Sequence, residues 1–180
     1  DQAKPGDIVE LNDVSYTIYA PLRIDKEITI RSAGENKAQL LFIGEVNSPA
    51  FQMNPKGSIK LENISIKGQN NQLAFAPLGQ GMSSAYKLFI DNCVIEDFAY
   101  LLKATKGSCA DSINVSNTII QNCENGIVLA ADEKGDYNAE MVNIESCEFT
   151  NVKRNVIHFY RGGYDESTIG GFLTLSNNIF

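Results

Sequence analysis

Short runs of alternating apolar and polar residues recur along the chain, and most of the clearest runs turn at an asparagine. Such alternation over a few residues predicts β-strands with one buried face, and helical periodicity is absent from nearly the whole sequence. The most regular runs occupy residues 59–68, 87–98, 113–123, 142–152 and 173–180. The pattern therefore predicts an all-β protein.

These runs are copies of one phrase. When they are superimposed, the polar residues at which they turn are separated by 29, 25, 29 and 31 residues, namely Asn63, Asn92, Asn117, Ser146 and Asn177. Two positions before the turn lie Leu61, Ile90, Val115, Ile144 and Leu175. Three positions after it lie Ile66, Ile95, Ile120, Phe149 and Phe180. A fixed period of this kind indicates a solenoid, in which equivalent residues of successive coils stack in columns.

The fold that satisfies this pattern is a right-handed parallel β-helix with coils of about 25–31 residues. Asparagine tolerates the left-handed backbone of a tight bend, and stacked asparagines can hydrogen-bond along the axis. An antiparallel sandwich or barrel is the alternative, but it does not explain the repeat. We expect one domain over residues 1–180, with irregular first coils in 1–56 and regular coils in 57–180. Because the pattern stops inside a strand at Phe180, we expect the chain to be a fragment of a larger protein.

Polar, glycine-containing loops of different lengths follow the second strand of each repeat. We therefore expect the insertions to collect on one side of the solenoid. A net charge of −7 and a pI of about 4.7 argue against nucleic acid or an anionic membrane surface as a partner. No apolar run approaches the roughly 18 residues that a membrane span needs.

The four cysteines are expected to be buried free thiols, namely Cys93, Cys109, Cys123 and Cys147. Cys93 and Cys147 share one repeat position but lie two rungs apart, on the order of 10 Å, which is too far for a disulfide. With His158 as the single histidine and no paired cysteines, a structural zinc site is not expected. The acidic loop residues Asp132, Glu133 and Asp136 are expected to be solvated rather than metal-binding.

The densest cluster of polar and aromatic side chains lies near the C-terminus, in His158, Tyr160, Arg161, Tyr164, Asp165 and Glu166. Aligning the second strands predicts one outward column of Ala74, Lys103, Val128 and His158. Its neighbour would contain Ala76, Thr105, Ala130 and Tyr160. A lyase for uronic-acid glycans needs a cation for the sugar carboxylate, a base for the C5 proton and a donor for the leaving oxygen. Residue types suited to these roles are Lys103, His158, Tyr160 and Arg161. Structural and surface roles are nevertheless the favoured interpretation of the same residues, ahead of carbohydrate contact and of catalysis.

Several phrases of the chain resemble polysaccharide lyase family 6, the chondroitinase B and alginate lyase family of the pectin-lyase-like superfamily. They are PGDIVELNDVSYTI, KEITIRSAG, GSIKLENISIKG, HFYRGGYDESTIGG and LTLSNNIF. The last two resemble the second, C-terminal β-helix of two-domain members. The resemblance implies a catalytic lysine with an arginine about one coil later and calcium ligands nearby. Here Val128 follows Lys103 by one coil, and Arg161 comes two coils later. Calcium is implied by the resemblance alone, and from the residues we expect no cofactor.

The sequence therefore predicts a β-helix domain of a secreted, periplasmic or cell-surface lyase-like protein, which is non-catalytic and serves polysaccharide binding or domain packing. Its partners would be an anionic polysaccharide, contacted by Tyr160, Arg161, Tyr164, Asp165 and Glu166, or a neighbouring catalytic domain. One alternative is an active lyase that performs β-elimination on a uronic-acid glycan. Another is a structural or adhesive β-solenoid.

Overall fold

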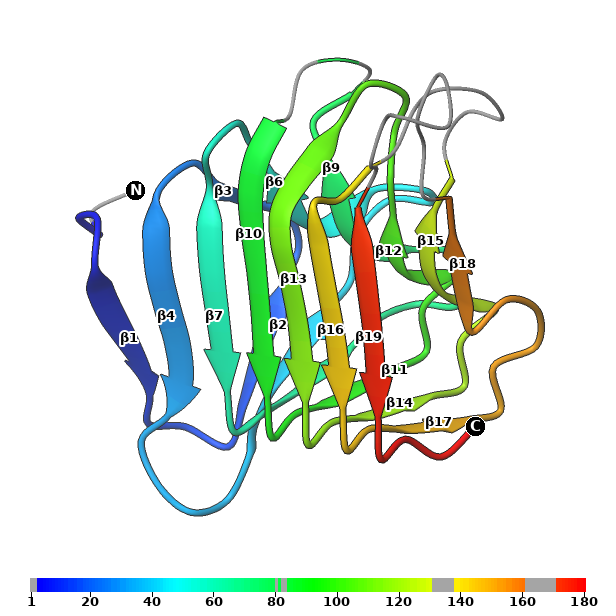
Figure 1. The fold of residues 1–180 in the computed structure, drawn as a ribbon. Helices are drawn as coiled ribbons and strands as arrows, with labels where there is room; N and C mark the ends of the chain where they lie inside the picture. The colour runs from blue at the N-terminus through cyan, green and yellow to red at the C-terminus, as the bar shows by residue number, and fades with distance from the viewer. Residues whose placement is uncertain (1–2, 80, 82–83, 131–137, 161–170) are drawn as a thin grey trace.

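The computed structural model describes residues 3–79, 81, 84–130, 138–160 and 171–180. Within these residues the chain winds through three parallel sheets in turn, so that every third strand falls in the same sheet (Figure 1). The seven strands of the first sheet are β1 (Asp7–Leu11), β4 (Glu27–Ser32), β7 (Ser58–Glu62), β10 (Ser84–Asp91), β13 (Cys109–Ser116), β16 (Met141–Glu145) and β19 (Phe172–Ser176). In Figure 1 they run side by side from blue to red, with the two termini at opposite ends of the stack.

The second and third sheets have six strands each. The second contains β2 (Ser15–Ile18), β5 (Ala38–Phe42), β8 (Ile64–Lys67), β11 (Val94–Glu96), β14 (Ile119–Gln121) and β17 (Glu148–Thr150). The third contains β3 (Leu22–Ile24), β6 (Pro49–Met53), β9 (Leu73–Pro77), β12 (Tyr100–Lys103), β15 (Asn125–Leu129) and β18 (Ile157–Phe159). All the pairings between named strands are parallel, which confirms the predicted parallel β-helix.

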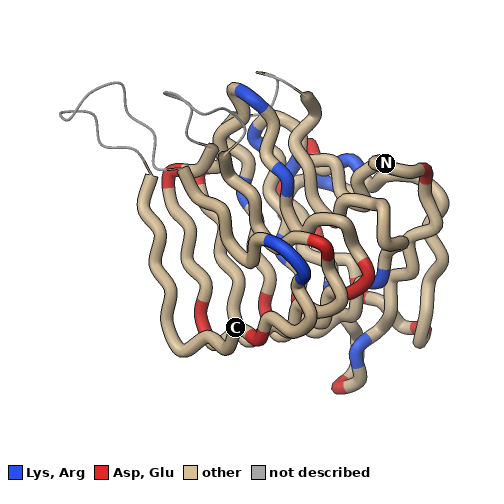
Figure 2. Tube along the Cα trace, turned by 90° about the vertical axis from the view of Figure 1, so that its right-hand side faces the viewer, with Lys and Arg blue, Asp and Glu red and all other residues tan. Residues whose placement is uncertain are grey.

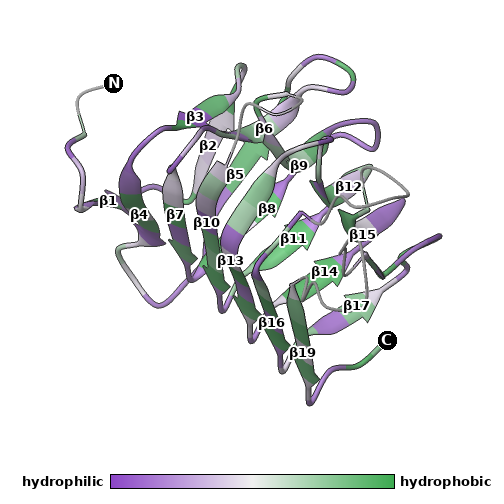
Figure 3. Ribbon diagram, turned by 45° about the horizontal axis from the view of Figure 1, so that its top comes forward, coloured by the Kyte–Doolittle hydropathy of each residue, from purple (hydrophilic) through white to green (hydrophobic). Residues whose placement is uncertain are grey.

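The register of the strands confirms the predicted columns, which are buried in the coils before the last one, where Leu175 and Phe180 are exposed. In the first sheet Leu61 pairs with Ile90, Ile90 with Val115, and the column continues through Ile144 and Leu175. In the second sheet the column is Ile66, Ile95, Ile120 and Phe149, and the ring of Phe180 stacks on that of Phe149 at 5.5 Å. Figure 3 shows the apolar positions along the strands and the hydrophilic ones concentrated in the bends. Removal of these apolar side chains from water is the main force that holds the coils together.

The bend between the first and second sheets is the sharpest turn of the coil. The aligned residues Asn63, Asn92, Asn117, Ser146 and Asn177 all adopt the left-handed conformation, with φ between 49° and 54°. This backbone is rare for residues other than glycine, and asparagine tolerates it best. The amide nitrogen of Asn92 donates to Oδ1 of Asn63 at 3.2 Å, so part of the asparagine column is hydrogen-bonded along the axis. In the first two coils the same connection is longer, with three residues (12–14) and five residues (33–37).

The connections from the third sheet back to the first differ most in length. They contain six residues after β9, five after β12, eleven after β15 and twelve after β18. Since all of them join the same two sheets, the insertions collect along one edge of the solenoid, as the repeat pattern predicts. The expected binding residues Arg161, Tyr164, Asp165 and Glu166 belong to the last of these connections and lie outside the described residues.

One predicted alignment is wrong by two residues. Phe75 pairs with Leu102, so Ala76 rather than Ala74 lies beside Lys103, and Ala74 is buried. The cause is the connection between β8 and β9, which has five residues (68–72), whereas the corresponding connection between β11 and β12 has three (97–99). The same shift removes Ala76 from the neighbouring column, where it was expected beside Thr105.

Candidate functional site

The outer face of the third sheet carries the predicted site residues that the structure describes. Lys103 pairs with Val128, and Val128 pairs with His158, which confirms this part of the predicted outward column. At the N-terminal end of the same column Arg23 pairs with Gln52, and Gln52 pairs with Ala76. The column therefore reads Arg23, Gln52, Ala76, Lys103, Val128 and His158. We call this set the third-sheet column.

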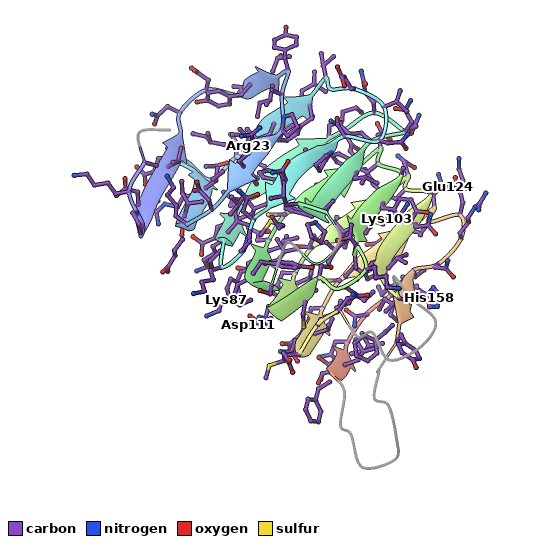
Figure 4. The ribbon with its side chains drawn as sticks, turned by 90° about the horizontal axis from the view of Figure 1, so that it is seen from above. Arg23, Lys87, Lys103, Asp111, Glu124 and His158 are labelled. Atoms are coloured by element: carbon purple, nitrogen blue, oxygen red, sulfur yellow. The ribbon has the colours of Figure 1, made fainter. Side chains whose placement is uncertain are left out.

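Lys103 is exposed, and its ammonium group lies 4.9 Å from the centroid of the Tyr100 ring. A cation over the face of an aromatic ring is attracted by the ring's quadrupole, by about 0.5–1 kcal/mol at an exposed site. The contact holds the charge over the sheet without neutralising it, so the ammonium group can still meet an anion. Figure 4 shows Lys103 and His158 on the third-sheet side of the molecule, away from Lys87 and Asp111 of the first sheet.

His158 and Tyr160 follow each other at the C-terminal end of this face. His158 is exposed and lies two rungs from Lys103, which places the two side chains on the order of 10 Å apart. Tyr160 is half-buried, and its backbone N–H donates to the carbonyl oxygen of Leu129 at 3.2 Å. Val128 lies on the rung between them. Lys103 and His158 therefore share one face of the sheet but are not in contact.

An ion-pair cluster borders this face where the second sheet turns into the third. Arg154 donates from Nε to Glu124 Oε1 at 2.7 Å, and Lys153 lies 3.5 Å from the other carboxylate oxygen. Beside it Asn155 donates to Oδ1 of Asn125 at 3.3 Å, which repeats the rung-to-rung amide bond of the first bend. Figure 2 shows basic and acidic segments scattered over this side, not gathered into large regions of one sign. Glu124 is thus already paired by neighbouring cations.

Sequence reasoning missed Arg23 and Gln52 because they lie in the first coils, where the repeat is hard to align. A local signal was nevertheless present. Arg23 lies between Leu22 and Ile24, and Gln52 lies between Phe51 and Met53. A polar residue between two apolar ones in a short strand points to the opposite face from its neighbours. Glu124 and Arg154 could have been connected in the same way, because they lie 30 residues apart, which is one coil.

Cys93, Cys123 and Cys147 are buried as predicted, whereas Cys109 is only partly buried, so the prediction of a buried thiol is wrong for that residue. Burial raises the pKa of the Cys93 and Cys123 thiols to about 11 and also raises the pKa of Cys147. Their Sγ atoms donate to backbone carbonyl oxygens two residues earlier, such as that of Asp91 at 3.2 Å from Cys93. None of the four cysteines forms a disulfide, as predicted. A protonated, buried thiol is a packing group and not a reactive one.

Metal ligation has no obvious place in the described part of the chain. Groups of three or more histidine, cysteine, aspartate or glutamate side chains that could hold a metal ion are absent from the described residues. Asp132, Glu133 and Asp136 lie outside those residues. A helix long and apolar enough to span a bilayer is likewise not found among the residues described. What the face offers chemically is therefore a set of separated cations and hydrogen-bonding groups on a rigid sheet.

Residues 14–139 match the profile of a protein family described as "Domain of unknown function (DUF4957)". The chain belongs to this family. No curated protein matches it. Among solved structures, the chain is similar to the PL6 family alginate lyase AlyGC, with a TM-score of 0.87 and 24% sequence identity. A mutant of the same lyase, with an arginine replaced by alanine, gives a TM-score of 0.83 and 25% identity.

This DUF4957 chain superimposes on only part of AlyGC. Each superposition covers 98% of this chain but 26% of the lyase chain, so the chain spans about a quarter of the length of the enzyme that it resembles. The resemblance to polysaccharide lyase family 6 that the sequence suggested is thus confirmed as a resemblance of the β-helix.

Proposed function

We propose that this chain is a non-catalytic β-helix domain of a polysaccharide lyase-like protein, and that its third-sheet column binds an anionic polysaccharide. Alginate, on which the similar enzyme AlyGC acts according to its name, is the first glycan to test. With a partner of this kind, we expect the protein in the periplasm, on the cell surface or in the secreted fraction. A neighbouring catalytic domain would then supply the chemistry.

The observation that supports this proposal is the composition of the third-sheet column. Arg23, Lys103 and His158 point outward from one sheet together with Gln52, and the column contains no carboxylate. Stacked rungs repeat at about 4.8 Å, so an extended polyanion that follows the axis can meet both Arg23 and Lys103, which lie three rungs or roughly 14 Å apart. This local arrangement provides positive charge on a chain whose net charge is −7.

The affinity should be modest and should depend on salt. An exposed ion pair contributes about 0.2–1 kcal/mol, and salt screens it. Two such contacts, from Arg23 and Lys103, plus hydrogen bonds from Gln52 and His158 correspond to a dissociation constant of roughly 1 mM for a short oligosaccharide. A long polysaccharide would bind more tightly through repeated contacts.

The spacing of the same residues favours binding over catalysis. β-Elimination needs a base and a charge-neutralising group at one sugar residue. On the rungs next to Lys103 the column presents Ala76 and Val128, and His158 is a further rung away. A single uronate at Lys103 would therefore meet one cation of the column and not the two functional groups that the reaction needs.

The proposal is tested by alginate binding and turnover at low ionic strength. We expect calorimetric binding without unsaturated product, and we expect Lys103→Met to weaken binding at least threefold. Lys87→Met is the matched control, because Lys87 is also exposed but lies on the first sheet. Product formation that Lys103→Met abolishes would instead establish an active lyase. A folded protein that neither binds nor cleaves alginate or chondroitin would support a structural solenoid.

A further inference from the structure

Among the five aligned bends between the first and second sheets, one position departs from asparagine. Ser146 occupies the place that asparagine holds in the coils on both sides, with the same left-handed backbone (φ 53°, against 49° for Asn117 and 54° for Asn177). The backbone of the bend is thus unchanged, but the side chain is shorter by an amide group. A hollow of about 340 Å³ opens at this point. Its lining consists of Asn117, Thr118, Ile119, Ser146, Cys147, Glu148, Asn177 and Ile179.

The hydrogen bonds along the asparagine column, which contains Asn63, Asn92, Asn117 and Asn177, determine which polar atoms face the hollow. Asn92 donates its amide N–H to Asn63, and Asn117 donates its own to Asp91 Oδ1 at 2.9 Å, so both amides point their nitrogen toward the N-terminal end. The carbonyl oxygen of Asn117 therefore faces the coil of Ser146. On the opposite wall, the side-chain amide of Asn177 makes no hydrogen bond to any described residue. Asn177 lines the hollow, so its amide can donate a hydrogen bond to a ligand there.

The polar groups at the floor of the hollow already have hydrogen-bond partners within the protein. The Cys147 thiol donates to the carbonyl oxygens of Glu145 and Val115 at 3.3 and 3.5 Å, and its backbone N–H donates to Asn178 Oδ1 at 2.9 Å. The groups left to meet a ligand are therefore those of the walls. Glu148 contributes a carboxylate that uses one oxygen to accept from Thr150 at 2.8 Å and keeps the other available.

These walls match the chemistry of a neutral sugar. A hydroxyl can donate to Asn117 Oδ1 and accept from the Asn177 amide, and an adjacent hydroxyl can donate to Glu148. Ile119, which is 38% exposed, offers apolar surface to the C–H face of a sugar ring. We propose that this hollow binds one neutral sugar unit through a pair of adjacent hydroxyls. The Glu148 carboxylate disfavours an anionic sugar.

The site differs from the one in the proposed function in both place and charge. It lies at the bend between the first and second sheets, whereas the third-sheet column lies on another face and carries cations. The inference does not rest on alginate binding. A calcium ion is a poor fit, because Ca²⁺ takes about 6–8 oxygen ligands, several of them carboxylates, and a single carboxylate lines the hollow.

The test is an NMR titration of the side-chain amides of Asn117 and Asn177 in the isotopically labelled chain. We expect methyl α-mannopyranoside to shift both signals saturably. Cyclohexanol, which has a ring but a single hydroxyl, and sodium glucuronate should shift them at least tenfold more weakly. Titration with calcium chloride alone covers the cation alternative. The proposal is wrong if the mannoside shifts neither amide, if glucuronate matches it, or if calcium shifts the amides at lower concentration than the sugar does.

Two variants separate binding from folding. Ser146→Asn should complete the asparagine column, raise the urea midpoint of unfolding and weaken sugar binding at least tenfold. Ser65→Asn makes the same substitution on the second sheet, outside the hollow, and should leave binding unchanged. Glu148→Gln should keep the fold and reduce the preference for mannoside over glucuronate. Undiminished mannoside binding by folded Ser146→Asn would overturn the proposal, whatever the result with alginate.

Discussion

Lys37 offers a sharp test of how the asparagine column is stabilised. Its ammonium group donates to Asn92 O at 2.7 Å, to Asn92 Oδ1 at 2.8 Å and to Asn63 Oδ1 at 3.1 Å. Replacing it with methionine keeps most of the aliphatic stem and removes all three charge-assisted bonds. Lys37 belongs to the five-residue connection 33–37, so this one side chain ties that connection to two successive coils.

The expected loss can be worked from these contacts. Hydrogen bonds to charged groups contribute about 1.5–3 kcal/mol each when they are well buried. Lys37 is half-buried and Asn92 is exposed, so water can replace most of what is lost. We therefore expect Lys37→Met to lower the free energy of unfolding by about 1–2 kcal/mol in total. For a chain of this size that corresponds to a melting temperature lower by about 2–8 °C.

The assay is urea unfolding followed by circular dichroism, with thermal unfolding as a second measurement. Lys87→Met is the control, because that exposed lysine makes no described contact with the column and should change stability by less than about 0.5 kcal/mol. If Lys37→Met were no less stable than Lys87→Met, the reasoning about the bend would be refuted. A decrease in the free energy of unfolding above about 4 kcal/mol would also contradict the reasoning, because water would then not be replacing the lost hydrogen bonds.

Three further predictions concern other parts of the fold. A thiol reagent at mildly alkaline pH should label the partly exposed Cys109 in the native chain and reach Cys93, Cys123 and Cys147 only in urea, which mass spectrometry can count. The hydrogen bond from Ser116 holds the pKa of Asp91 below its ordinary value of 3.8, so Asp91 stabilises the fold above that pH and loses this effect as pH falls through its folded pKa. Asp91→Asn should therefore flatten the acid limb of a stability–pH curve, and an unchanged limb would disprove the assignment. Gly57→Ala would place Cβ against the carbonyl oxygen of Ile24 and should cost more than about 2 kcal/mol in a urea titration. Gly34→Ala meets nothing within 4 Å, and equal effects would contradict the packing argument.

The repeat made most of the architecture predictable. The residues at the sharp bend share a backbone conformation that few residue types adopt, so Asn63, Asn92, Asn117 and Asn177 could be aligned from the amino-acid sequence alone. With these positions aligned, period-two alternation assigned the inward columns of the first two sheets. The third sheet was less predictable, because the connections that lead into it vary from three to six residues. A two-residue difference there was enough to misplace Ala74.

Contacts between distant coils were beyond sequence reasoning. Lys37 and Asn92 are 55 residues apart and do not occupy equivalent repeat positions, so no pattern connects them. Ser146 was recognised as an equivalent of asparagine, but its shorter side chain has a consequence only in three dimensions, where a hollow opens between the neighbouring coils. The candidate site was predicted in its C-terminal half, through Lys103, His158 and Tyr160. Its N-terminal half, with Arg23 and Gln52, was not predicted, because the bends of the first coils depart from the repeat.

The central claim is that the outer face of the third sheet binds an anionic polysaccharide. The most direct test is an NMR map of backbone amide shifts on titration with alginate oligosaccharides at low salt. The account predicts that the shifted residues lie along β3, β6, β12, β15 and β18, around Arg23, Lys103 and His158, and that the shifts weaken as salt is added. Shifts confined to the outer face of the first sheet, or none at saturating oligosaccharide, would contradict it.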